Sequence, residues 1–318
     1  MRTSPRIVTL TLNPAVDLAC MAPAVRPTHK IRAFDERFDP GGGGINVSRV
    51  IHILGGQTLG LVMTGGETGH LLAELLDEAG VPWQRIRIRG RNRVSVNVHD
   101  QQSGLEYRFV PEGPTVQPDE WAAALGLLET VEADWIVASG SLPRGVPADF
   151  YVRAAAIAAR RGQHFVVDTS GVGLKAAAAD GVTMLKVSLG ELEFLVGRPL
   201  EHVASQDLAV TGLLRSGSAK MIAVSLGEDG ALLATRNGII RLAAIPVQAR
   251  GAVGAGDSFL AGLVLGLARG LTDRLALAFG MAAGAAAVTT YGTAQVRRDD
   301  VEALYRTWCE KDAAAAGV

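Results

Sequence analysis

Hydrophobic and polar positions follow two different patterns along this chain. Short runs rich in Val, Ile and Leu predict buried strands at 6–12, 58–64, 135–138, 164–168, 184–187, 220–226 and 231–235. Apolar residues that recur every three or four positions predict helices at 45–54, 68–79, 117–132, 147–161 and 259–269. The composition of Gly227–Gly230 indicates a hairpin turn between the last two strands. The alternation of strands with helices predicts an α/β domain.

Residues 18–40 break this alternation. Stretches such as Lys30–Phe34 alternate charged with apolar residues, which predicts short strands on a flap that is open to solvent on one face. Lys30 and Arg32 would share one face of such a strand. They fit either an exposed edge that discourages aggregation or a phosphate-binding role.

A second flap is indicated by a stripe of arginines. Arg85, Arg87, Arg89, Arg91 and Arg93 recur at every second residue, so a single strand would present all of them on one face, typical of a solvated basic edge. Arg93 also leads into a hairpin-like alternation at 94–110 that could pair with the first flap. Arg108 would lie on the second strand of this hairpin.

Two glycine-rich segments each precede a helix. Gly41–Gly44 is followed at once by apolar positions at helical spacing, which is unlike a flexible linker, and Asn46 lies in the first turn. Gly251–Ser258 contains Asp257 and precedes the strongly apolar segment 259–269. Glycine lets backbone approach a ligand, and free N–H groups at a helix N-terminus attract anions. Asp257 is either an ordinary N-cap or a carboxylate beside an anion site.

Composition limits the classes of function. The chain has 318 residues, of which 48% are hydrophobic and 20% are charged, and its net charge is −1. This balance predicts a folded chain with a sizeable core and no global attraction to nucleic acid or membranes. Cys20 and Cys309 offer no disulfide framework, which favours a reducing compartment such as the cytoplasm. The uncharged segment 275–296 is mostly Ala, Gly and Thr, so we expect tight packing in a soluble domain.

The order of several motifs carries a family resemblance. TLTLNPAVD, GGGGINVSRVI, YRFV, ASGSLPRGV, VSLGEDGA and VGAGDS stand in the order and spacing of the ribokinase-like (PfkB-type) carbohydrate kinases, and the match covers nearly the whole chain. Neither a P-loop sequence nor GxGxxG at the first βα turn is present. Gly41–Gly44 contains no lysine, which favours the 6-phosphofructokinase branch over the 1-phosphofructokinase and tagatose-6-phosphate kinase branches.

The resemblance implies a fold and a reaction. The fold would be a three-layer α/β/α domain with a central mostly parallel sheet, formed by 1–13, 41–90 and 112–318. A small β-sheet lid, 14–40 and 91–111, would also form a homodimer interface. The reaction would be ATP-dependent phosphoryl transfer to the C1 hydroxyl of fructose 6-phosphate, with Mg²⁺ and, as an optional further ion, K⁺. Tagatose 6-phosphate and fructose 1-phosphate are the alternative substrates.

The resemblance also implies roles for individual residues. Asp257 would be the catalytic base, and the anion hole would be Gly254, Ala255 and Gly256. The sugar contacts would be Asp17, Gly42, Gly43 and Asn46. The contacts to the substrate's own phosphate would be Lys30, Arg93 and Ser141, with Arg32 and Arg108 as further candidates. The nucleotide contacts would be Lys186, Ser188, Ser225, Gly227 and Gly230, and Glu191 would belong to the metal–water network.

One position departs from the family pattern. Ser188 stands where the family's Asn-x-x-Glu motif has asparagine, and the hydroxyl is shorter than an amide. This motivates an alternative of another class, a sugar-phosphate-binding protein with weak catalysis. The presence of Asp257 and of the whole glycine turn argues against that alternative.

Overall fold

The computed structural model describes residues 5–249, 251, 253–289 and 296–316. Its main sheet has mostly parallel strands, and only its last two strands, β12 and β13, run antiparallel to their neighbours. In spatial order the strands are β13 (Gly238–Leu242), β12 (Ala231–Thr235), β11 (Ala219–Ser225), β10 (Val182–Ser188), β9 (His164–Asp168), β8 (Trp135–Ser139), β1 (Arg6–Thr11), β4 (Gln57–Thr64) and β5 (Trp83–Arg87). Each of the seven buried strands predicted for the main sheet is therefore present.

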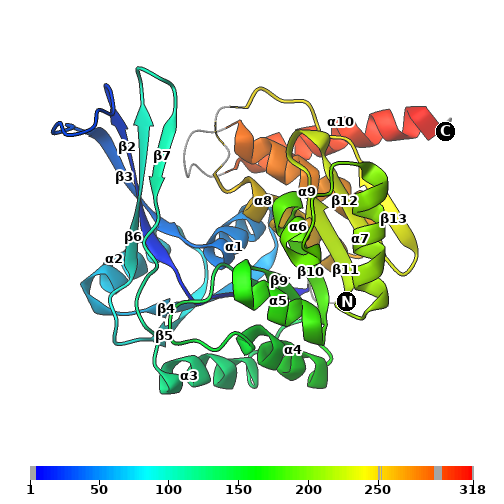
Figure 1. Ribbon diagram of the computed structural model, residues 1–318, viewed down its shortest axis with the longest axis horizontal. Coiled ribbons are helices and arrows are strands. Elements are labelled where there is room, and N and C mark those ends of the chain that lie inside the picture. The colour runs from blue at the N-terminus through cyan, green and yellow to red at the C-terminus, as the bar shows by residue number, and fades with distance from the viewer. Residues whose placement is uncertain (1–4, 250, 252, 290–295, 317–318) are drawn as a thin grey trace.

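Helices cover both faces of this sheet, which confirms the predicted three-layer architecture (Figure 1). One face packs against α1 (Gly43–Ile53), α8 (Ala255–Ala268), α9 (Asp273–Val288) and α10 (Arg298–Ala316). The other face packs against α3 (Pro118–Leu128), α4 (Phe150–Arg160), α5 (Gly171–Asp180), α6 (Leu189–Val196) and α7 (Val203–Arg215). The two apolar layers hold the strand ends in place and so fix the geometry of the loops that follow them.

A separate four-stranded sheet stands beside the main sheet (Figure 1). Its order is β3 (Phe34–Gly41), β2 (Ala15–Ala22), β6 (Arg93–Asp100) and β7 (Glu106–Phe109). Strands β6 and β7 form the predicted hairpin, and β6 pairs with β2 of the first flap. A small apolar cluster joins this sheet to α2 (Gly66–Glu78), through Val16 of β2 and Leu72 of α2. We call residues 14–40 and 91–111 the lid.

Two predictions about the flaps are wrong. No strand includes Lys30 or Arg32, because Pro27 and the left-handed Thr28 (φ 63°) turn the chain before β3 begins at Phe34. The arginine stripe does not lie on one strand either. Strand β5 ends at Arg87, and the chain then crosses from the main sheet to the lid.

Side-chain contacts explain why the arginine stripe divides at this crossing. Arg89 pairs with Asp119, and Arg91 pairs with Glu67. The turn is held by Asn92, whose amide accepts from Gly65 N at 2.9 Å and donates to Met63 O at 3.0 Å. The basic edge is therefore split between two local ion pairs and a structural turn.

The Ala- and Gly-rich segment is a buried helix, α9, as far as residue 288. It lies so close to α8 that a Cβ on Gly262 would be 2.8 Å from Phe279 O, and a Cβ on Gly280 would be 2.8 Å from Phe259 O. The prediction of tight packing is thus confirmed for the described part of 275–296. Among the described residues, no helix is both long enough and apolar enough to cross a membrane.

Some elements had no clear pattern in the sequence. In α9 the apolar residues surround the helix instead of forming one stripe, because α9 is buried by α8, α10 and the sheet. The structure also shows five elements that the sequence did not predict: α5, α6, α7, α10 and β13. The predicted helices at 117–132 and 147–161 are shorter than expected, since α3 ends at Leu128 and α4 begins at Phe150.

Candidate active site

Most of the predicted site residues gather where parallel strands of the main sheet end, beside the lid; Lys30 and Arg32 do not. Asp168 ends β9, Ser188 ends β10, and the N-termini of α1 and α8 face the same region. Ligands in open α/β folds bind at this edge of the sheet. The fold therefore places the two glycine segments of the sequence on either side of one site.

Asp257 lies in the first turn of α8. Gly254 is the N-cap in the left-handed region (φ 76°), so the helix begins at Ala255 and leaves its first N–H groups without intrahelical acceptors. Asn46 Nδ2 of α1 donates to Asp257 Oδ2 at 2.9 Å, which joins the two glycine segments directly. Burial, and then the nearby charge of Asp168, raise the pKa of Asp257 to about 6. A carboxylate with this pKa suits a general base near neutral pH.

A buried ion pair lies beside this turn. Lys186 Nζ of β10 donates to Asp168 Oδ1 at 3.1 Å, and the two side chains are only 9% and 12% exposed. Ser139 Oγ at the end of β8 donates to the other carboxylate oxygen, Oδ2, at 3.1 Å. A Cβ placed on Gly256 would lie 3.1 Å from Lys186 Nζ, so the ammonium group lies close to the backbone of the predicted anion hole.

Neighbouring protein atoms explain much of the glycine requirement at 41–44. A Cβ on Gly41 would lie 2.2 Å from Asp17 Oδ2, and one on Gly43 would lie 2.2 Å from Ser139 Oγ. Gly42 has a φ of 128°, which also favours glycine. The sequence interpretation attributed these glycines to a ligand alone. The structure adds that they let Asp17 and Ser139 reach the backbone before α1.

Ser188 is the N-cap of α6 and forms a capping box with Glu191. Its hydroxyl accepts from Glu191 N at 3.3 Å, while its backbone N and its Oγ donate to Glu191 Oε2 at 2.7 and 3.0 Å. Serine and asparagine are about equally good N-caps. Replacement of asparagine by serine at this position is therefore compatible with the local fold, and Glu191 keeps a fixed position.

A cavity of about 630 Å³ lies next to the N-terminus of α8. It brings together three of the predicted nucleotide residues, Ser225, Gly227 and Gly230, with Ala255 and Gly256 of the predicted anion hole. The rest of its wall is mainly apolar and includes Ile245, Pro246, Val247, Phe259, Met281 and Val288. Such a volume with few polar groups fits a small organic ligand. A nucleotide whose base lay against this apolar wall would have its phosphates near Gly256.

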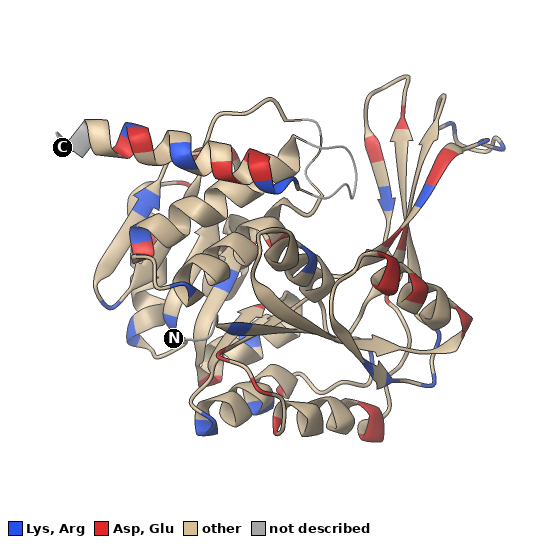
Figure 2. Ribbon diagram, turned by 180° about the vertical axis from the view of Figure 1, so that it is seen from behind, with Lys and Arg blue, Asp and Glu red and all other residues tan. Residues whose placement is uncertain are grey.

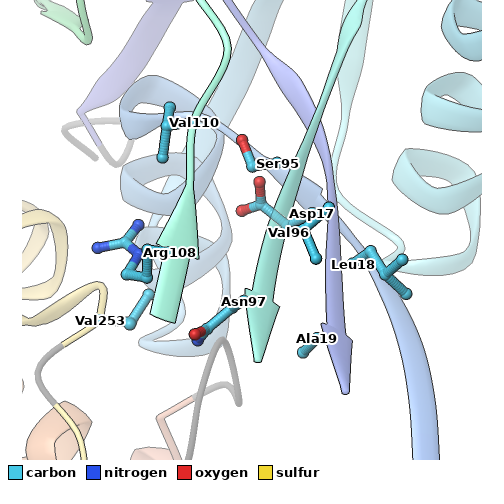
Figure 3. A pocket seen from close by; sticks show the side chains of 9 residues that line it. All are labelled: Asp17, Leu18, Ala19, Ser95, Val96, Asn97, Arg108, Val110 and Val253. Carbon is cyan, nitrogen blue, oxygen red and sulfur yellow. The ribbon is translucent and has the colours of Figure 1, made fainter. Parts of the chain in front are cut away.

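Asp17 of β2 lies on the lid, next to Ser95 and Asn97 of β6 and Arg108 of β7 (Figure 3). These side chains line a small pocket that Val253 of the α8 turn also reaches. Burial raises the pKa of Asp17, whereas the hydrogen bond from Ser95 and the charges of Arg108 and Arg93 oppose that shift. The lid thus presents an acid with cationic neighbours toward the glycine turn.

Arg93 and Ser141 meet through Asn13. Arg93 donates to Asn13 O at 2.8 Å and to Pro111 O at 2.9 Å, and Asn13 Nδ2 donates to Ser141 Oγ at 3.2 Å. Burial lowers the pKa of Arg93. Its Nε and Asn13 Oδ1 are buried and have no hydrogen-bond partner among the described residues. A buried donor of this kind can be satisfied by a bound anion.

Lys30 and Arg32 lie elsewhere in the chain. Both are exposed in the connection between β2 and β3, at the outer tip of the lid, where Figure 2 shows a group of basic positions. Within one chain the structure does not bring them to Asp17 or Arg93. Arg250 and Ala252, which flank Gly251, lie outside the described residues.

Sequence reasoning missed three polar residues of the site: Asn13, Ser139 and Asp168. Asp168 closes the buried run His164–Asp168, and Lys186 lies near the end of the next strand. A carboxylate and a lysine at the ends of two buried strands form a signal that could have identified the pair. Asn13 and Ser139 also follow strands, but their partners are distant in sequence.

Together these groups can bind and transfer an anion. Backbone N–H groups and the Lys186 ammonium stabilise negative charge at the start of α8, and Asp257 can accept a proton there. Among the described residues, no group of three or more His, Cys, Asp or Glu side chains could hold a metal ion by itself. The single carboxylate of Glu191 fits Mg²⁺, which commonly binds through one or two carboxylates together with substrate phosphates and water.

Comparison with known proteins yields close relatives. The chain is 44% identical over 308 residues to ATP-dependent 6-phosphofructokinase isozyme 2 of Mycobacterium tuberculosis H37Rv, with 96% of this chain and 91% of the relative covered. It is 37% identical over 302 residues to the protein of that name from Escherichia coli K12, with 94% and 98% covered.

A crystal structure of phosphofructokinase-2 from E. coli in complex with fructose-6-phosphate superposes with a TM-score of 0.90 at 35% identity, covering 95% of this chain and 99% of that chain. Two further structures of that E. coli protein are described as a complex with potassium and as a tetrameric inhibited form. The pfkB family carbohydrate kinase model matches residues 10–299. The chain therefore belongs to the pfkB family of carbohydrate kinases.

Proposed function

We propose that this protein is an ATP-dependent 6-phosphofructokinase, which transfers the γ-phosphoryl group to the C1 hydroxyl of fructose 6-phosphate and releases fructose 1,6-bisphosphate. The observation that carries this proposal is the direct bond between Asn46 and Asp257, because it joins the sugar turn to the start of α8 beside a buried cation. Both curated relatives are named for this activity.

In this proposal Asp257 accepts the proton of the C1 hydroxyl as the hydroxyl oxygen attacks the γ-phosphorus of ATP, and the bond from that phosphorus to the bridging oxygen of the β-phosphate breaks so that ADP leaves. The N–H groups at Gly254–Gly256 and the Lys186 ammonium then stabilise the charge on the transferred group. Asp17, Gly42, Gly43 and Asn46 hold the sugar. The pocket lined by Ser225, Gly227 and Gly230 holds the nucleotide. The residues do little covalent chemistry, since phosphoryl transfer depends mainly on position and charge.

The metal belongs to the same proposal. When bound, Mg²⁺ would neutralise the phosphates of ATP, and Glu191 would orient it through water, with Ser188 fixing Oε2 of that carboxylate. Potassium is proposed as a further ion, supported by the E. coli structure described as a complex with potassium. An enzyme with these substrates would work in the cytoplasm.

The lid supports a proposed homodimer. Five large apolar side chains of the lid are at least 38% exposed: Ile31, Phe38, Leu105, Phe109 and Val110. Phe38 and Phe109 lie on the small sheet and the other three on its connecting segments. Exposed apolar groups gathered on one such region favour a protein interface. Sedimentation velocity on Phe109→Asp checks this, with Val172→Asp as a control at an even more exposed apolar site outside the lid. A dimer that persists in Phe109→Asp would contradict the role of the lid.

A substrate comparison tests the proposed activity. The purified protein is assayed with ATP and Mg²⁺ on fructose 6-phosphate, tagatose 6-phosphate, fructose 1-phosphate and fructose. We expect the highest kcat/KM on fructose 6-phosphate. A higher kcat/KM on either of the other two phosphates would reassign the substrate. No turnover on any of them, combined with measurable sugar-phosphate binding, would support the alternative of a binding protein with weak catalysis.

A further inference from the structure

The hydroxyl of Ser139 lies between the two halves of the site. On one side it contacts the sugar turn, because a Cβ placed on Gly43 would lie 2.2 Å from Ser139 Oγ. On the other side it donates to Asp168 Oδ2 at 3.1 Å, and Lys186 Nζ donates to Oδ1 of the same carboxylate at 3.1 Å. Lys186 in turn lies close to the backbone at Gly256, since a Cβ placed there would be 3.1 Å from its Nζ. Ser139, Asp168 and Lys186 thus form a hydrogen-bonded line of side chains that runs from beside Gly43 to beside Gly256.

Burial makes the geometry of this line important. Taken as whole residues, Ser139 is only 1% exposed, and Asp168 and Lys186 are 9% and 7% exposed. A buried ion pair offsets its loss of hydration only when its geometry is good and its remaining lone pairs are bonded. Each oxygen of Asp168 has one of these bonds, so the carboxylate is held against rotation. Without the Ser139 hydroxyl, Oδ2 would lose its side-chain donor and the carboxylate could turn.

We propose that Ser139 is a positioning residue for phosphoryl transfer. It fixes Asp168 so that Lys186 stays against the N-terminus of α8, where the transferred group must be stabilised. Ser139 acts through the ion pair and does not itself touch the reacting atoms. This inference rests on the proposed kinase activity and extends it, because neither the motifs nor the family resemblance gave Ser139 a role.

Ser139→Ala should lower kcat about 10-fold, which is the lower end of the effect of a hydrogen bond to a charged group. The KM for fructose 6-phosphate should change less than about 3-fold, because the predicted sugar contacts remain. A merely structural role would instead lower the amount of folded enzyme and leave kcat per active site unchanged. Active-site titration with a tight-binding nucleotide analogue separates these two results.

Thr169→Val is a matched control. Thr169 is also a buried hydroxyl at the end of β9, but it donates to Gly140 O at 2.9 Å and not to the ion pair. Tyr151 OH donates to the same carbonyl at 3.0 Å, so Gly140 O keeps a partner in the variant. We expect kcat within about 2-fold of the parent. An equal loss in Thr169→Val and Ser139→Ala would overturn the proposal.

A double-mutant cycle gives the decisive result. If Ser139 acts through Asp168, adding Ser139→Ala to Asp168→Asn should change kcat less than about 2-fold. Fully additive losses would overturn the proposal. Lys186→Met provides a second background with the same expectation if Asp168→Asn does not fold.

Nucleotide binding separates this inference from the proposed function. If the parent phosphorylates none of the tested sugars, the proposed function fails. The same double-mutant cycle is then repeated by calorimetry, with the dissociation constant for ATP in the presence of Mg²⁺ as the measured quantity. Weaker binding in Ser139→Ala that disappears in the Asp168→Asn background would still support the positioning role. Unchanged binding in Ser139→Ala would overturn it.

Discussion

The α8 side of the site and the lid differ in how their charges are satisfied. Beside α8, Lys186 is buried and paired with Asp168, and Asp257 is bonded to Asn46. On the lid, Lys30 and Arg32 are exposed, and large apolar side chains face solvent. The residues proposed for phosphoryl transfer are therefore assembled within one folded chain. The lid carries groups that a ligand or a second copy would complete.

The largest expected effect comes from removing the carboxylate of Asp257 beside α8. Asp257→Asn keeps the size of the side chain and removes the base, so turnover should fall by at least the ~10²–10⁴-fold typical of general acid–base catalysis. Binding of fructose 6-phosphate, measured by calorimetry, should change little. Turnover within a few-fold of the parent would remove Asp257 from this role.

The second-largest effect is expected from Arg93, and it tests whether the lid binds the phosphate of the substrate. Arg93→Ala should raise the KM for fructose 6-phosphate by roughly 10–150-fold, since a charge-assisted hydrogen bond is worth ~1.5–3 kcal/mol. The KM for ATP should rise less. Arg108→Ala serves as a comparison, because Arg108 is exposed and also carries charge toward Asp17.

Unphosphorylated fructose distinguishes two explanations for the Arg93 result. A phosphate contact predicts a loss for fructose 6-phosphate that is much greater than the loss for fructose. Equal losses would mean that Arg93 shapes the lid through its bonds to Asn13 O and Pro111 O.

The pH dependence should follow Asp257. Its pKa is raised to about 6, so kcat/KM should fall about tenfold for each pH unit below that value as the base becomes protonated. A raised carboxyl pKa means that the folded state holds the proton more tightly, and stability is lost as pH rises from about 4 through 6. Asp257→Asn should thus unfold at a higher temperature than the parent at pH 8, and at nearly the same temperature at pH 3.5. A stability difference that does not change with pH would contradict the shift.

The smallest effect concerns Ser188. Ser188→Asn restores the family residue and keeps a good N-cap, so the fold and kcat should be preserved. If the longer amide improves metal placement, the Mg²⁺ concentration for half-maximal rate should fall by about 2- to 3-fold. An unchanged or higher Mg²⁺ requirement would show that the capping box with Glu191 already places the carboxylate.

The parts that could be predicted from sequence are those set by local pattern. Buried runs of β-branched residues gave the strands, and Gly254 before an apolar helix placed Asp257 in its first turn. The side-chain contacts within the site were harder to predict from the sequence. Asn13 reaches Ser141 across 128 positions, and Lys186 meets Asp168 only because β9 and β10 are neighbours. Lys30 was misplaced because the left-handed Thr28 turns the chain just before a charged and apolar alternation that otherwise resembles a strand.

The backbone contact between α8 and α9 has a consequence for how this enzyme can evolve. Gly262 and Gly280 touch no predicted ligand, yet even one added methyl group at either would meet a carbonyl oxygen of the other helix at 2.8 Å. The helices would have to separate, and α8 would carry the anion-hole turn with it. Selection for turnover therefore acts on these two interior positions as well as on the pocket. Searches for faster variants should keep both glycines and diversify the walls of the cavity instead.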